Sequence, residues 1–143
     1  MILKPVDRRS NLSKKEFKTE YLDKGRPVVI TDLSKDWPGL SKWSFDFFKE
    51  NYGHLNVPLV DKTFHDAGSG YMTHRTIPFK EYIEAIEKGS SDLRLFLFNI
   101  FDAAPELRQD FIWPDIMDGF MKTLPYMFFG GEGSITPMHY DID

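Results

Sequence analysis

The sequence contains no cysteine, which excludes disulfide bonds, thiolate metal sites and cysteine nucleophiles. It also contains no long apolar run. The N-terminal residues 1–17 have neither the apolar core of a signal peptide nor the length of a membrane span. We therefore expect no membrane association and take a cytoplasmic location as the default.

Basic charge is scarce as well. Lys and Arg together number 18 against 22 for Asp and Glu, which gives a formal net charge of −4. Lys14, Lys15 and Lys18 fall on one predicted helix, where a solvated helix face explains them better than a phosphate-binding surface. The charge distribution therefore does not support nucleic-acid binding through bulk electrostatics.

What remains is the composition of an ordinary globular protein. The chain has 143 residues, of which 41% are hydrophobic and 28% charged, and this length is sufficient to bury a core. Aromatic residues make up 15%, which favours an aromatic core over an aromatic-lined pocket. Because no repeat or linker interrupts the sequence, we expect residues 1–143 to form a single partial domain.

Local signals predict three helices, at Ser13–Gly25, Ser44–Gly53 and Pro78–Gly89. The first opens with a capping box, the second with a serine cap and the third with a proline, and a glycine ends each of them. Apolar residues recur at helical spacing on the first and third helices, at Phe17, Tyr21, Leu22, Phe79, Tyr82, Ile83 and Ile86.

Four runs predict strands, at Pro27–Thr31, Leu55–Val60, Leu93–Phe98 and Tyr126–Phe129. The first run is continuously β-branched, as in buried strands. A turn is predicted at Asp36–Gly39, one or two short helices are predicted near Pro105 and Pro114, and Trp113, Tyr126 and Phe128 are expected in the core. This mixture indicates an α+β fold, with a helix and strand region at 1–92 and the first strands of a larger sheet at 93–143.

The clearest chemical signal is the C-terminal segment TPMHYDID. Alternate side chains of an extended chain share a face, so His139 and Asp141 point the same way. An imidazole and a carboxylate on one face are two of the three ligands in the facial triad of iron(II) oxygenases. An isolated His-x-Asp pair also occurs in solvated hairpin strands, so the residues alone leave both readings open. Its position after an aromatic strand and the glycine-rich turn Gly130–Ser134 favours a metal site.

In this context MFFGGEGSITPMHYDID resembles the iron-binding segment of JmjC/cupin-like oxygenases, in which a glycine turn precedes Thr-Pro and His-x-Asp. The resemblance covers Leu93–Asp143 best. It implies the N-terminal part of a double-stranded β-helix (a jelly roll), iron(II), and 2-oxoglutarate as co-substrate. It also implies that His139 and Asp141 bind the metal at the catalytic centre and that Thr136 helps to hold 2-oxoglutarate. An ordinary strand threonine is the alternative reading of Thr136.

Two departures from the family pattern concern this site. A strand tyrosine that contacts 2-oxoglutarate in an asparaginyl hydroxylase of the family aligns with Phe96, which has no hydroxyl group. The third metal ligand, a histidine, and the basic residue that pairs with 2-oxoglutarate would lie beyond Asp143. The remaining histidines, His54, His65 and His74, all precede the pair and are expected on loops or at the surface.

The resemblance implies an iron(II)- and 2-oxoglutarate-dependent hydroxylase that acts on a protein side chain or on RNA. The alternative is a cupin-like binding or interaction module without enzymatic activity. We expect the sheet to be truncated before the barrel closes and the 143-residue chain to be inactive by itself. Unpaired strand edges and uncovered aromatic side chains should then make it a homo-oligomer.

Overall fold

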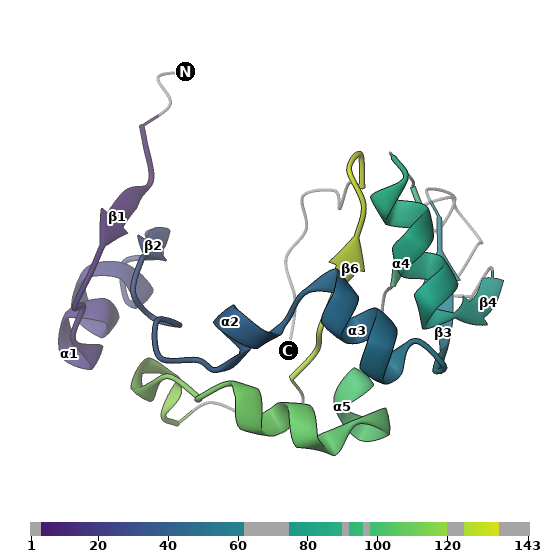
Figure 1. The fold of residues 1–143 in the computed structure, drawn as a ribbon. Coiled ribbons are helices and arrows are strands. Elements are labelled where there is room, and N and C mark those ends of the chain that lie inside the picture. Colours follow the sequence, from purple (N-terminus) through teal and green to yellow (C-terminus); the bar gives the residue numbers. More distant parts are fainter. Residues whose placement is uncertain (1–3, 62–74, 90–91, 96–97, 120–124, 135–143) are drawn as a thin grey trace. The chain divides into compact units, whose positions relative to one another are not determined.

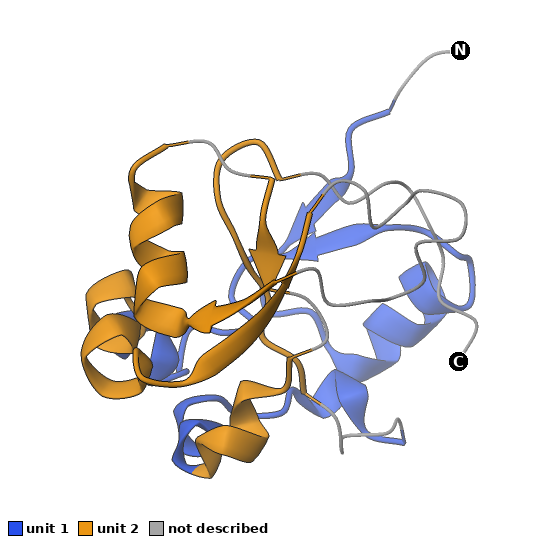
Figure 2. Ribbon diagram, turned by 90° about the vertical axis from the view of Figure 1, so that its right-hand side faces the viewer, with its two compact units in different colours: residues 1–42, 106–124 blue, residues 43–105, 125–143 orange. Residues whose placement is uncertain are grey.

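The computed structural model describes residues 4–61, 75–89, 92–95, 98–119 and 125–134 (Figure 1). The chain divides into two compact units, which Figure 2 shows in different colours. The first unit contains residues 1–42 and 106–124, and the second contains residues 43–105 and 125–143. In the described part of the chain no helix is long and apolar enough to cross a membrane.

The first unit begins with two short parallel strands, β1 (Asp7–Arg9) and β2 (Val28–Ile30), in which Asp7 faces Val28. Helix α1 (Lys14–Glu16) lies between them in sequence and continues as a π-helical segment, η1 (Phe17–Leu22). The Ser13 hydroxyl accepts a hydrogen bond from the Glu16 N–H at 3.2 Å, which confirms the predicted cap.

A Schellman motif ends this helical segment. Gly25 has a φ of +57°, its N–H donates to the Leu22 carbonyl at 3.1 Å, and the Arg26 N–H donates to the Tyr21 carbonyl at 2.9 Å. The left-handed conformation suits glycine because it has no Cβ. The predicted stop signal at Gly25 is therefore confirmed, and it turns the chain into β2.

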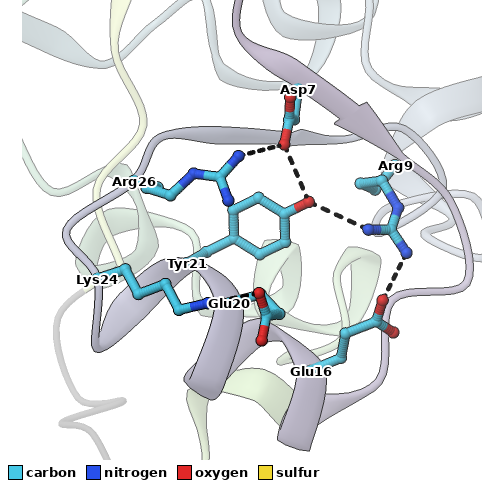
Figure 3. A network of polar contacts seen from close by, with 7 residues as sticks. All are labelled: Asp7, Arg9, Glu16, Glu20, Tyr21, Lys24 and Arg26. Atoms are coloured by element: carbon cyan, nitrogen blue, oxygen red, sulfur yellow. Dashed lines mark hydrogen bonds and ion pairs between the residues drawn. The ribbon is translucent and has the colours of Figure 1, made fainter.

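A polar network around Tyr21 joins β1 to the helical segment (Figure 3). The buried Tyr21 hydroxyl accepts a hydrogen bond from Arg9 at 3.1 Å and donates one to Asp7 at 3.3 Å. Arg26 forms an ion pair with the same Asp7 carboxylate at 2.9 Å, and Arg9 forms one with Glu16 at 2.5 Å. This network fastens β1, which the sequence did not predict as a strand.

Several predictions for the first unit were wrong in detail. Leu22 is 47% exposed, because the wider π-helical turn does not keep it on the α-helical face of Tyr21. Val29 is 38% exposed, so β2 is not a buried strand; among the described strands it pairs with β1 alone. Gly39 begins a short helix, α2 (Gly39–Lys42), instead of closing a turn.

The proline-containing region forms three short helical segments, α5 (Ile100–Ala103), η3 (Pro105–Asp110) and η4 (Asp115–Met117). Within the first unit, the buried Asp110 carboxylate of η3 pairs with Lys42 of α2 at 2.7 Å. Trp113 is partly buried, with its ring edge-on to Phe111 at a centroid distance of 5.3 Å. Lys14, Lys15 and Lys18 are exposed, as predicted for a solvated helix face.

The second unit contains a four-stranded antiparallel sheet in the order β4-β3-β5-β6. Its strands are β3 (Asn56–Val60), β4 (Arg75–Pro78), β5 (Arg94–Leu95) and β6 (Phe129–Gly130). The first predicted run here, Leu55–Val60, is confirmed, and the strand predicted at Tyr126–Phe129 is shorter and later. Among the described residues the strands form an open sheet and no closed barrel, and the mixture of helices and strands confirms the α+β prediction.

Two helices pack side by side in this unit, α3 (Phe45–Tyr52) and α4 (Phe79–Glu87) (Figure 1). Ser44 caps α3 by accepting from the Phe47 N–H at 3.1 Å, as predicted. At the start of α4, backbone carbonyls replace a side-chain cap: Phe79 N–H donates to Leu55 at 2.7 Å and Lys80 N–H to Gly53 at 3.0 Å. The predicted apolar face of α4 is buried at all four positions, Phe79, Tyr82, Ile83 and Ile86.

Candidate functional site

The predicted site residues Thr136, His139 and Asp141 lie outside the described residues, as does Phe96. The structure does describe the segment that leads into the His-x-Asp motif. We call Phe129–Ser134 the approach segment; it comprises the last residues of the sheet and the turn that follows. Its contacts show how the second unit holds the residues that come before the predicted site in the sequence.

An aromatic cluster holds the first residue of the approach segment. The ring of Phe129 is edge-on to Phe48 of α3 at a centroid distance of 5.0 Å and edge-on to Phe79 of α4 at 4.9 Å. Edge-to-face contacts of this kind add to the stabilisation from apolar burial. Both helices therefore anchor β6 through a single side chain.

A buried hydroxyl group holds the backbone at the same place. Tyr82 of α4 is 0% exposed; its hydroxyl donates to the Phe129 carbonyl at 2.8 Å and accepts from the Leu95 N–H at 3.3 Å. The Leu93 carbonyl also lies 3.2 Å from this oxygen. Burial disfavours the phenolate and raises the pKa of Tyr82 to about 12. The hydroxyl therefore stays protonated and joins β5 to β6.

The turn of the approach segment packs directly on α4. The Gly131 carbonyl accepts from both the N–H and the hydroxyl of Ser134, at 3.2 and 2.9 Å. Gly133 has a φ of +88°, as at the third position of a type II turn. A Cβ on Gly131 would lie only 3.0 Å from the Cβ of Ile86, so the backbone approaches α4 as closely as glycine allows.

An open hollow of about 460 Å³ lies beside β6 in the second unit. We call it the aromatic hollow, because most of the residues that line it are aromatic. The lining residues are Trp43, Ser44, Phe45, Phe48, Phe128, Phe129 and Gly130. Phe128 is 61% exposed and Tyr126 is 43% exposed, so the prediction that they pack in the core was wrong. They come directly before β6, and their rings contact each other at a centroid distance of 6.3 Å.

Elsewhere in the described residues, no group of three or more histidine and acidic side chains could hold a metal ion. His54 is exposed, in agreement with its predicted surface position, and His65 and His74 lie outside the described residues. The metal ligands His139 and Asp141 of the His-x-Asp (HxD) motif are therefore predicted from the sequence alone.

The sequence model of the family described as "Cupin-like domain" matches residues 14–143. The chain belongs to the cupin-like domain family. This match covers the helix and strand region as well as the approach segment and the HxD motif, and it confirms the predicted resemblance. The match thus includes all of the second unit and the first unit from residue 14 onward, while β1 lies before it.

Curated relatives of this cupin-like domain carry JmjC-type names. The chain is 30% identical over 150 residues to "Lysine-specific demethylase JMJ30" of Arabidopsis thaliana, covering 96% of this chain and 33% of that protein. It is 29% identical to "JmjC domain-containing protein D" of Dictyostelium discoideum, covering 98% and 36%. It is 26% identical to "Lysine-specific demethylase 8" of Danio rerio, covering 96% and 36%. The chain spans about a third of the length of these relatives.

The structure also reveals one residue whose part in the site the sequence did not indicate. Helical spacing placed Tyr82 on the buried face of α4, and this is confirmed. Its link to β5 and β6 depends on the register of Leu95 opposite Phe129, which are far apart in sequence. The only sequence signal was a tyrosine at a fully buried position, where a hydroxyl group needs a hydrogen-bond partner.

Proposed function

We propose that the full-length protein containing this cupin-like domain is an iron(II)- and 2-oxoglutarate-dependent oxygenase that hydroxylates a C–H bond of its substrate. The observation that carries the proposal is the His139-x-Asp141 pair, inside a family match that extends over residues 14–143. Imidazole and carboxylate donors fit iron(II), which these enzymes bind through two histidines and one carboxylate.

In this proposal His139 and Asp141 hold the iron, and the Thr136 hydroxyl donates a hydrogen bond to a 2-oxoglutarate carboxylate. Bound iron, 2-oxoglutarate and O₂ would together supply the oxidising chemistry, in which O₂ is the oxidant, one oxygen atom enters the substrate C–H bond, and 2-oxoglutarate is converted to succinate and CO₂. Thr136 and His139 differ in strand parity, and Pro137 between them lacks an N–H, which permits a bulge that brings both side chains to one face. The described part of the chain contributes the anchored approach segment, which precedes these residues in the sequence.

The names of the relatives indicate a class of substrate and no individual substrate. Two of them are named as lysine-specific demethylases, which favours an N-methylated lysine as one candidate. Hydroxylation of an N-methyl carbon gives a hemiaminal, which breaks down to formaldehyde and the demethylated amine. Hydroxylation of any other carbon leaves a stable alcohol. The product therefore distinguishes a demethylase from a side-chain hydroxylase.

Metal binding by the full-length protein tests the proposal. Calorimetry under anaerobic conditions should show iron(II) binding by the wild type, and His139→Ala should abolish it. His54→Ala is the matched control, because His54 is an exposed histidine away from the motif, and it should bind iron normally. Unchanged affinity in His139→Ala would remove this residue from the site.

Turnover provides the second arm of the test. In the presence of O₂ the iron-loaded, reduced protein should convert 2-oxoglutarate to succinate and CO₂, slowly even without its substrate, and His139→Ala should not. An N-methyl-lysine peptide should release formaldehyde if the protein is a demethylase. Iron binding without succinate above the His139→Ala background would instead support the cupin-like binding module.

A further inference from the structure

Two strands of the second unit lead to the two halves of the proposed site. Leu95 of β5 directly precedes Phe96, which by the family resemblance takes the position of a tyrosine that contacts 2-oxoglutarate. Phe129, in β6, begins the approach segment, which runs toward Thr136 and His139. Leu95 and Phe129 face each other in register. Their separation therefore sets where both halves of the site begin.

The hydroxyl of Tyr82 bridges this pair of residues. It accepts from the Leu95 N–H at 3.3 Å and donates to the Phe129 carbonyl at 2.8 Å. Tyr82 is 0% exposed, Leu95 is 1% exposed and Phe129 is 9% exposed, so water does not compete for these groups. Because β5 and β6 pair over only two residues each in the described part of the chain, this ladder alone holds them together weakly.

The same helix also supports the approach segment one turn further along. Ile86 of α4 contacts the backbone at Gly131, where a Cβ would already be too close, and Phe79 packs edge-on against Phe129. Helix α4 thus touches the approach segment at three points, through Phe79, Tyr82 and Ile86. Of these three side chains, only Tyr82 also bonds to β5.

We propose that Tyr82 is a positioning residue of the proposed oxygenase: its hydroxyl fixes the separation of β5 and β6, the two strands that precede Phe96 and the HxD motif in the sequence. The inference rests on the proposed function. It assigns a role in ligand binding to a buried side chain that is not among the proposed ligands of iron or of the co-substrate.

Tyr82→Phe in the full-length protein tests this role, because it removes the hydroxyl group and keeps the ring. Residues that orient metal ligands typically change metal affinity about 10- to 100-fold when mutated. Tyr82 does not contact a proposed metal ligand directly, so we expect an effect at the lower end of this range. Iron(II) affinity should weaken about tenfold, the KM for 2-oxoglutarate should rise by a similar factor, and kcat should change less.

Tyr21→Phe is the matched control. Tyr21 is also a buried tyrosine with a doubly hydrogen-bonded hydroxyl, but it belongs to the Arg9 and Asp7 network of the first unit. Both variants should lower the melting temperature, and only Tyr82→Phe should change iron affinity and the KM. A second variant, Tyr82→4-aminophenylalanine, keeps a group that donates and accepts, and should bind iron within about threefold of wild type.

The outcomes separate the inference from the proposed function. If wild type and His54→Ala bind iron and His139→Ala does not, the proposed function stands and Tyr82→Phe decides the positioning role. Wild-type iron affinity and KM in a folded Tyr82→Phe protein would overturn that role, as would an equal loss in Tyr21→Phe. If Tyr82→Phe fails to fold, a tenfold loss in a folded 4-aminophenylalanine variant would overturn it. A wild type that binds no iron would overturn the proposed function itself.

Discussion

Alanine at position 131 tests how closely α4 holds the approach segment. The new Cβ would lie 3.0 Å from the Cβ and 3.1 Å from the Cγ2 of Ile86. Carbon atoms pack best at roughly 3.5–4.0 Å, so the turn or the helix must move by about half an ångström. Ile86 is only 6% exposed and belongs to a packed helix, so its side chain cannot move away to relieve the contact. Overpacking of this kind costs about 1–3 kcal/mol.

The neighbouring glycine provides the control. A Cβ on Gly130 would lie 3.0 Å from the Oγ of Ser134, which is the end of a rotatable side chain rather than part of a helix. Neither glycine has a φ in the left-handed region, so alanine meets no backbone strain at either position. Rotation of Ser134 relieves the contact, and the lower entropy of the unfolded alanine chain offsets part of the loss. We expect Gly130→Ala to stay within about 0.5 kcal/mol of wild type.

Urea denaturation of both variants, with equal m-values, measures the difference in unfolding free energy. A double-mutant cycle with Ile86→Ala removes the Cγ2 contact, and in that background the cost of Gly131→Ala should fall by at least about 0.5 kcal/mol. A cost for Gly131→Ala no greater than that for Gly130→Ala would refute the reasoning. It would mean that the turn moves freely over α4 and that the helix does not fix the start of the site.

Four further predictions follow from the caps, the buried tyrosine and the predicted site. Ser44→Ala should destabilise the protein by about 1 kcal/mol in the same assay, because it removes the N-cap of α3. Burial raises the folded-state pKa of Tyr82 to about 12, above the ordinary value of roughly 10. Its contribution to stability should therefore be complete below pH of about 10 and decline as the pH rises toward about 12, and Tyr82→Phe should show a flatter profile over that range in thermal melts. Phe96→Tyr should alter the KM for 2-oxoglutarate, and an unchanged value would count against the family alignment at that position. The isolated 143-residue chain should scatter light as a dimer or larger, since Phe45 and Phe128 expose apolar surface in the aromatic hollow, whereas a folded monomer of 16.7 kDa would contradict this.

The elements that the sequence predicted correctly are those with a local cause. The caps at Ser13 and Ser44, the helix stop at Gly25 and the apolar face of α4 depend on residues a few positions apart. The polar strand β1 has no alternating pattern; it exists because it pairs with β2 and because Tyr21 binds its side chains. Local patterns do not encode such long-range pairing.

The same limit applies to the candidate site. The HxD motif is visible in the sequence because its residues are adjacent, and it remains a prediction, since His139 and Asp141 lie outside the described residues. The bridge through Tyr82 was not predictable, because it requires the register that places Leu95 opposite Phe129. The exposure of Phe128 was mispredicted, because an apolar residue beside a strand usually packs inward.

The two units are interleaved along the chain, and this connectivity limits how the protein can be dissected. The backbone passes from one unit to the other after residues 42, 105 and 124. A cut at the first of these points leaves the first unit incomplete, a cut at the last leaves the second incomplete, and a cut at the middle one interrupts both. Single truncations therefore cannot yield two intact fragments. Limited proteolysis or truncation after residue 105 should therefore disrupt both units, whereas a cut after residue 42 or residue 124 should disrupt one unit and spare the other.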